Sequence, residues 1–201
     1  MGEVFLEESF DSLAYNIARQ VRERKTPTIP LRVLEIDTWS GQSTLAIAQP
    51  NVLVYCCSLW DMSPPYGSPK RSERQWLEVR QGEGNCPEHI AFRTFVQNAN
   101  GIVFRTAMPL RLPLEVLRGC WTDPLDAVYI NGEDNPAWLR YCVQLWEPLV
   151  RPGGNFYGLY KDHTVEALTG LGGYQVDGTI WRHRVLKEWE HEDPTPAREP
   201  D

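Results

Sequence analysis

The chain places two carboxylates beside a small-residue turn that leads into a helix. In the segment LRVLEIDTWSGQSTLAIA, residues 31–48, Glu35 and Asp37 end an apolar strand and Gly41 precedes a helical stretch. A strand of an α/β sheet delivers such a turn to its carboxyl edge, where backbone N–H groups point outward and the helix N-terminus adds a partial positive charge. This arrangement suits a ligand with carboxylate or phosphate groups, so we expect a binding site at residues 35–43.

Further polar side chains follow three later apolar segments, each of which has the composition of a buried strand. They are Ser58, Trp60 and Asp61 after residues 52–57, Asn131 and Asp134 after residues 125–130, and His163 after residues 155–160. Because the carboxyl ends of parallel strands meet at one edge of a sheet, we expect these side chains to surround the same cleft.

Four segments resemble, in order and spacing, the motifs of class I S-adenosylmethionine (SAM)-dependent methyltransferases, in the small-molecule O-methyltransferase-like branch. They are EIDTWSGQST at 35–44, YCCSLWD at 55–61, DAVYING at 126–132 and LWEPLVRPGG at 145–154. The resemblance covers about residues 30–185. It implies a Rossmann-like α/β fold, with a mostly parallel twisted sheet, an antiparallel C-terminal hairpin and helices on both faces.

The resemblance also implies roles for individual residues in binding SAM. Glu35 would face the methionine ammonium, Gly41 would give the cofactor access to the backbone, and Ser58 would stand where a carboxylate usually accepts both ribose hydroxyls. A second interpretation of Glu35 is a strand-end carboxylate that caps a nearby backbone N–H. The expected cofactor-binding set is Glu35, Asp37, Thr38, Gly41, Ser43, Ser58, Trp60, Asp61 and Asn131.

The chain departs from the family's pattern at four polar positions. Asp37 stands in place of glycine, Ser58 in place of an acid, and Asn131 and Tyr160 in place of aspartates. Loss of a charge-assisted ribose acceptor at Ser58 removes about 1.5–3 kcal/mol, or about 10- to 150-fold in affinity. Asp37 narrows the approach of the cofactor, although aspartate tolerates left-handed backbone angles better than most residues.

Asp134 and His163 are the candidate acid/base residues at this edge. A histidine titrates near neutral pH, which suits a general base, but His163 also fits a helix cap or a surface position. Glu133 and Asp134 could hold Mg²⁺ with waters, whereas Asn131 is a weaker ligand and Tyr160 supplies no carboxylate oxygen. We therefore expect no metal.

Apolar periodicity predicts the elements that position these residues. An amphipathic helix is expected around residues 6–21, and further helices at 42–49, 73–79, 87–99, 113–118, from 135 onward and at 164–171. Strands are expected at 31–36, 52–57, 102–105, 125–130 and 155–160, followed by a hairpin of residues 174–176 and 179–186. Residues 152–154, Pro-Gly-Gly, are expected to turn the chain into the fifth strand. The proline-rich segment 61–72 is either a lid over the site or a surface excursion.

Length and charge favour one domain with an acidic tail. The 201 residues are 42% hydrophobic and 23% charged, as expected for a globular protein, with the domain at 1–186. Residues 187–201 contribute −4 to a net charge of −7 and contain three prolines, so we expect a disordered tail. This charge does not favour a nucleic-acid partner.

Cysteine usage and hydropathy favour a cytoplasmic protein without a membrane span. The five cysteines form no C-x-x-C pair, and an odd number without a secretory leader indicates reduced thiols. No apolar run approaches the roughly 18 residues that a membrane span requires.

Two functional hypotheses lead, and a pocket reused for another nucleotide or sugar ligand is a third possibility. The first is SAM-dependent methyl transfer to a small-molecule acceptor, with a hydroxyl as the expected nucleophile. The second is a catalytically inactive methyltransferase-fold protein, a pseudoenzyme, that serves as a binding or assembly subunit in a homo- or hetero-oligomer. The kept scaffold motifs favour the first hypothesis, and the four changed polar positions favour the second.

Overall fold

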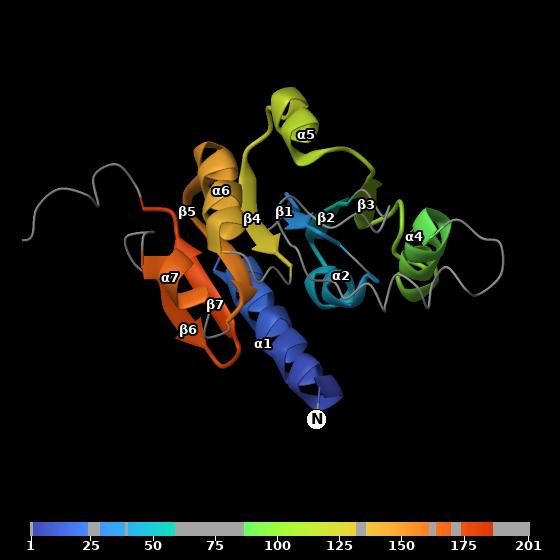
Figure 1. Cartoon of the computed structure of the whole chain (residues 1–201), viewed down its shortest axis with the longest axis horizontal. Helices are drawn as coiled ribbons and strands as arrows, with labels where there is room; N and C mark the ends of the chain where they lie inside the picture. The colour runs from blue at the N-terminus through green and yellow to red at the C-terminus, as the bar shows by residue number, and fades with distance from the viewer. Residues whose placement is uncertain are drawn as a thin grey trace, which may run out of the picture.

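A computed structural model describes residues 2–23, 29–38, 40–58, 87–131, 136–160, 164–169 and 174–186 of the chain. The described residues form a seven-stranded sheet with helices on both faces (Figure 1). The strands are β1 Leu31–Ile36, β2 Val52–Cys57, β3 Ala107–Leu110, β4 Leu125–Ile130, β5 Val150–Leu159, β6 Gln175–Asp177 and β7 Ile180–Arg184. The helices are α1 Gly2–Arg22, α2 Gln42–Ile47, α4 Pro87–Asn98, α5 Leu114–Cys120, α6 Pro136–Trp146, the 3-10 helix η1 Glu147–Leu149 and α7 Thr164–Thr169.

The strand order is β3-β2-β1-β4-β5-β7-β6. Strands β1 to β5 run parallel, and β7 joins β5 and β6 in antiparallel register. The apolar side chains of β1, β2 and β4 suit strands that are covered on both faces, as in a parallel sheet. The expected α/β fold, with a mostly parallel sheet and an antiparallel C-terminal hairpin, is confirmed.

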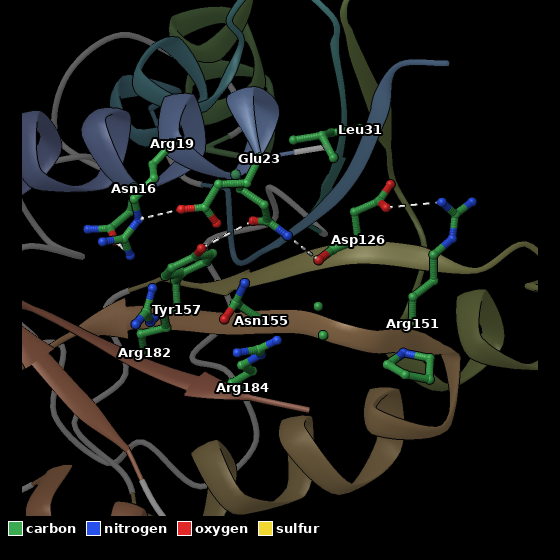
Figure 2. Close-up of a pocket in the computed structure, with 14 residues that line it drawn as sticks. Asn16, Arg19, Glu23, Leu31, Asp126, Arg151, Asn155, Tyr157, Arg182 and Arg184 are labelled. Atoms are coloured by element: carbon green, nitrogen blue, oxygen red, sulfur yellow. Dashed lines mark hydrogen bonds and ion pairs between the residues drawn. The ribbon is translucent and has the colours of Figure 1, made fainter. Parts of the chain in front are cut away.

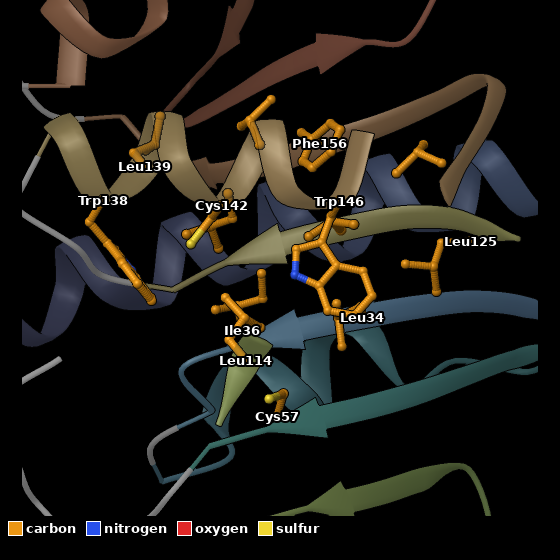
Figure 3. Packing of buried hydrophobic residues seen from close by; sticks show 14 of the residues in the cluster. Leu34, Ile36, Cys57, Leu114, Leu125, Trp138, Leu139, Cys142, Trp146 and Phe156 are labelled. Atoms are coloured by element: carbon orange, nitrogen blue, oxygen red, sulfur yellow. The ribbon is translucent and has the colours of Figure 1, made fainter. Parts of the chain in front are cut away.

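Alternation along the strands divides the core into two layers. On one face, Val33 of β1 packs in a cluster that includes Leu13 and Ile17 of α1, Ile47 of α2 and Phe95 of α4. On the other face, Leu34 and Ile36 pack in a cluster with side chains of α5, α6 and α7, where the fully buried Trp146 of α6 lies against the sheet (Figure 3). Because side chains alternate with period two, Glu35 points to the same face as Val33, toward α2.

The prediction of a strand at residues 102–105 is wrong. The chain turns there after α4, with backbone bonds from Ile102 to Ala99 and from Arg105 to Ile102, and Phe104 has a φ of 60°. The third strand begins at Ala107 and lies at the edge of the sheet. Pro109 is tolerated in this strand because an edge strand needs hydrogen bonds on one side only.

The turn predicted at residues 152–154 is also wrong, because these residues lie inside β5. The register shifts between Leu125, which pairs with Val150, and Ala127, which pairs with Asn155. The extra residues form a bulge in which Gly153 has a φ of 81°. The Pro-Gly-Gly sequence therefore bends a strand and does not precede one.

The other described elements agree with their predicted positions to within a few residues at each end, a scatter that is usual for helix ends. The helix predicted at 73–79, the segment 61–72 and the tail 187–201 lie outside the described residues. Among the described helices, none combines the length and apolar character needed to cross a membrane.

Candidate functional site

The strand order reverses between β1 and β4, and the carboxyl ends of these two strands form the topological switch point of the sheet. From β1 the chain continues to β2 and β3 on one side, while β4 pairs with the other side of β1 and leads to β5. Open α/β sheets bind ligands at such a reversal of strand order. Asp37 and Asn131 directly follow the two strands and lie at this switch point.

Glu35 is fully buried, and both of its carboxylate oxygens accept hydrogen bonds from α2. The Ser43 hydroxyl donates to Oε1 in a short contact, and the Thr44 hydroxyl donates to Oε2 at 2.6 Å. Burial raises the pKa of the Glu35 carboxyl above its ordinary value, and the bonds from Ser43 and Thr44 oppose that rise. Glu35 therefore ties α2 to β1 through side-chain hydroxyls, whereas the alternative interpretation expected it to cap a backbone N–H.

Asp37 and Thr38 begin the turn after β1. Asp37 has a φ of 63°, the left-handed conformation that favours glycine, and its N–H donates to the Cys57 carbonyl at 2.9 Å. Thr38 is fully buried, and its hydroxyl donates to the Glu35 carbonyl at 3.4 Å. The prediction that aspartate tolerates the glycine-like conformation is confirmed, and the turn keeps its path despite the substitution.

Gly41 ends this turn with a φ of 84° and stands directly before α2. A Cβ at this position would lie 2.9 Å from Cδ2 of Phe95 on α4, so glycine is required by backbone angle and by space. Asn98 of the same helix donates to the Ser40 carbonyl at 2.8 Å. Phe95 and Asn98 of α4 thus contact the turn and fix its position. The sequence analysis did not identify these two residues, and no motif indicates them.

Asn131 connects the end of β4 to the turn after β1. Its Nδ2 donates to the Asp37 carbonyl at 3.1 Å and approaches the Ser43 hydroxyl at 3.4 Å, and its backbone N–H donates to the Ile36 carbonyl at 3.0 Å. A carboxylate would place an acceptor against the Asp37 carbonyl. The amide of Asn131 therefore fits this position, because it can donate to the carbonyl. The family that the sequence resembles has aspartate here.

Ser58 follows β2 and is partly exposed, with its backbone N–H donating to the Leu110 carbonyl at 3.2 Å. It lies at the same edge as Asp37, because Ile36 pairs with Cys57 in the register of β1 and β2.

The structure brings five of the predicted residues into one hydrogen-bonded group, which we call the switch-point network: Glu35, Asp37, Thr38, Ser43 and Asn131. Gly41 and Ser58 flank it. Trp60, Asp61, Asp134 and His163 lie outside the described residues. Within the part of the chain that the structure describes, no group of three metal-ligating side chains occurs.

The adjacent cysteines have no nucleophilic character. Burial is the main cause that raises the pKa of Cys57 to about 12, with the charges of Asp37 and Glu115 adding to the rise. Burial likewise raises the pKa of Cys56. Both thiols stay protonated at neutral pH, and the interpretation of these residues as core is confirmed.

No family model and no curated protein sequence matches the chain. The fold is shared by many solved structures, including the following three. The O-methyltransferase NovP has a TM-score of 0.59 at 14% identity over 88% of this chain and 80% of that one. An rRNA methylase from Streptococcus thermophilus has a TM-score of 0.54 at 12% identity over 93% of this chain and 99% of that one. SMU.1697c from Streptococcus mutans, a putative methyltransferase solved in complex with SAH, has a TM-score of 0.53 at 10% identity over 92% of this chain and 100% of that one.

These identities are too low to carry function, and the named acceptors differ between the neighbours. The structural similarities show the fold alone. The order of the seven strands and the helices on both faces are those of the class I methyltransferase fold.

Proposed function

We propose that the chain binds SAM at the switch-point network and transfers its methyl group to an acceptor. The observation that carries this proposal is the turn after β1, which Asn131 at the end of β4 holds by a hydrogen bond and which lies where an open α/β sheet of this order binds its ligand. SAM supplies an electrophilic methyl sulfonium, and the chain's task is to hold and orient it.

The polar groups present fit the cofactor in part. The carboxylates of Glu35 and Asp37 give the negative charge that a methionine ammonium needs, with Glu35 acting through the hydroxyl of Ser43 because it is fully buried. Ser58 offers one hydroxyl to the ribose in place of a carboxylate. Trp60 and Asp61 remain proposed contacts beyond it.

Calorimetry with SAH tests binding directly. Ser58→Ala should weaken SAH by about 2- to 10-fold, the value of one neutral hydrogen bond. Arg105→Gln, at an exposed position before the start of β3 and away from the switch-point network, is the control and should bind as the unaltered chain does. If millimolar SAH gives neither heat nor a thermal shift, the proposal fails.

We further propose a small-molecule hydroxyl as the acceptor, with Asp134 or His163 as the acid/base group and without a metal. SAH release in the presence of hydroxyl-bearing compounds measures the reaction. If the His163 side chain moves the proton, His163→Asn should lower kcat and leave KM nearly unchanged. Adding a metal chelator should leave the rate of SAH release unchanged.

A second function, a non-catalytic binding or assembly subunit, is favoured by one feature of the network. Both carboxylate oxygens of Glu35 accept hydrogen bonds from α2, and Asn131 donates across the switch point to the Asp37 carbonyl. Under this function the unaltered chain does not bind SAH, whereas Asp37→Gly combined with Ser58→Asp recovers binding. Turnover of any methyl acceptor by the unaltered chain excludes it.

A further inference from the structure

A cleft of about 380 Å³ lies at the edge of the sheet opposite to the switch-point network (Figure 2). It is bounded by the C-terminal half of α1 and by the first residues of β1, β4 and β5, among them Leu31, Asp126 and Arg151. The proposed SAM site lies at the other ends of these same strands. The cleft is therefore a separate feature of the molecule.

Strand register explains which side chains line the cleft. Asn155 pairs with Arg184, and Tyr157 pairs with Arg182, across the antiparallel pair β5 and β7. Directly opposite residues, and residues two apart on one strand, point to the same face, so these four side chains face α1. Tyr157 donates its hydroxyl hydrogen to Gln20 of α1 at 3.1 Å, which fixes the helix above the cleft.

Two of the four lining arginines are paired with acids. Arg151 contacts the Asp126 carboxylate at 3.1 Å, and Arg19 lies 3.9 Å from the Glu23 carboxylate. These pairs account for both acidic residues among the side chains that line the cleft.

The other two arginines are not neutralised. Arg182 donates to the side-chain oxygen of Gln175, a neutral partner. For Arg184, no side-chain hydrogen bond or ion pair is found among the described residues, and its Nη2 lies 3.7 Å from the place of a Cβ on Gly153, at the cleft wall. The lining thus carries two uncompensated positive charges in a chain of net charge −7, which attracts an anion to this position.

Asn155 supplies a second, independent observation. Its side chain lines the cleft, the residue is 7% exposed, and its Oδ1 is buried without a hydrogen-bond partner in the described part of the chain. Figure 2 shows it between Tyr157 and Arg184. Buried acceptors are nearly always satisfied, so an unpaired one on a side chain that lines a cleft marks a place where a ligand can supply the donor.

We propose that the cleft binds a small phosphate monoester that carries a hydroxyl group, such as a polyol or sugar phosphate. A phosphate monoester has a charge of about −1.5 to −2 at neutral pH, which matches the two free guanidinium groups. Arg182 and Arg184 hold the phosphate oxygens, because a guanidinium donates two parallel hydrogen bonds to such groups. Because Oδ1 of Asn155 is closed to solvent in this conformation, the amide rotates to turn Oδ1 toward the cleft, where a ligand hydroxyl donates to it. This site is independent of the proposed methyl transfer.

Calorimetry of the full chain at low salt tests the proposal, with glycerol 3-phosphate, inorganic phosphate and glycerol as probes. Glycerol 3-phosphate should bind more tightly than inorganic phosphate, and glycerol should not bind. Arg184→Gln and Arg182→Gln should each weaken glycerol 3-phosphate by about 10- to 100-fold, and Arg105→Gln, the exposed control, should change it less than twofold.

Asn155→Leu separates the hydroxyl contact from the charge. It should reduce the affinity for glycerol 3-phosphate to that for inorganic phosphate and leave the latter unchanged. Circular dichroism checks that each variant is folded, and the two arginine variants decide the outcome if the leucine variant is not. The proposal is overturned if neither phosphate compound binds, if Arg105→Gln weakens binding as much as Arg184→Gln, or if a short RNA binds while glycerol 3-phosphate does not.

Discussion

Asn131→Asp gives the sharpest test of the switch-point network, because it restores the residue type of the resembled family at the position where the structure requires an amide. The change removes the Nδ2 donor that contacts the Asp37 carbonyl at 3.1 Å and the Ser43 hydroxyl at 3.4 Å. Ser43 cannot replace the lost donor, because its hydrogen is already given to Glu35. The new carboxylate then faces a carbonyl oxygen with no partner.

The magnitude follows from these contacts. Two hydrogen bonds are worth about 1 kcal/mol each, and a partly desolvated acceptor left without a donor adds about 1–3 kcal/mol, so Asn131→Asp should lower the free energy of unfolding by about 3–5 kcal/mol. Asn131→Ala loses the two bonds without adding charge and should lower the free energy of unfolding by about 2 kcal/mol. Urea denaturation at neutral pH measures both values.

The difference in the free energy of unfolding between Asn131→Asp and Asn131→Ala isolates the effect of the added charge. This difference should become smaller on acidification, because the carboxyl group of the aspartate variant can, once protonated, again donate to the Asp37 carbonyl. An aspartate variant as stable as the unaltered chain, or more stable than the alanine variant at neutral pH, would refute this role of the Asn131 amide.

Three other outcomes are expected. Burial raises the pKa of Glu35 above its ordinary value of 4.5. The free energy of unfolding of the unaltered chain, relative to that of Glu35→Gln, should therefore be highest below pH 4.5 and decline as the pH rises through the raised pKa. Urea denaturation at a series of pH values measures this. Gly41→Ala should lower the free energy of unfolding by about 1–3 kcal/mol, since its φ is 84° and an α4 ring lies 2.9 Å from the added Cβ, whereas Gly119→Ala, in an open position on α5, should raise it by about 0.5–1 kcal/mol. A thiol reagent at neutral pH should modify the exposed Cys120 and spare Cys57, whose pKa is about 12, as peptide mass mapping would show.

The hydrophobic pattern within a segment was sufficient to predict those elements whose structure depends on that segment alone. The apolar runs at 31–36, 52–57 and 125–130 are strands with the predicted bounds. The left-handed turn at Asp37 also agrees with expectation, because a short polar side chain accommodates that conformation. The errors fell where local signals conflict. The apolar residues 102–104 form turns, and the glycines after Pro152 form a bulge, because the neighbouring strands set the register.

The contacts that define the site join distant parts of the chain. Asn131 and Asp37 are separated by 94 residues, and Gly41 meets Phe95 of a different helix. No spacing in the sequence indicates that an amide at 131 is needed to satisfy a carbonyl at 37. The same holds for the phosphate cleft, in which Asn155 and Arg184 become neighbours only through the antiparallel pairing of β5 with β7.

The sequence by itself determined the α/β class, the parallel strands, and the edge of the sheet at which residues 35–43 lie, because hydrophobic periodicity and turn chemistry act over short distances. The tertiary structure alone decided that Glu35 binds α2, that Asn131 bonds to the turn after β1, and that two arginines remain uncompensated around Asn155. The physical reason is that hydrogen bonds and charge pairs depend on which strands become neighbours, and that order is fixed only when the whole sheet has formed.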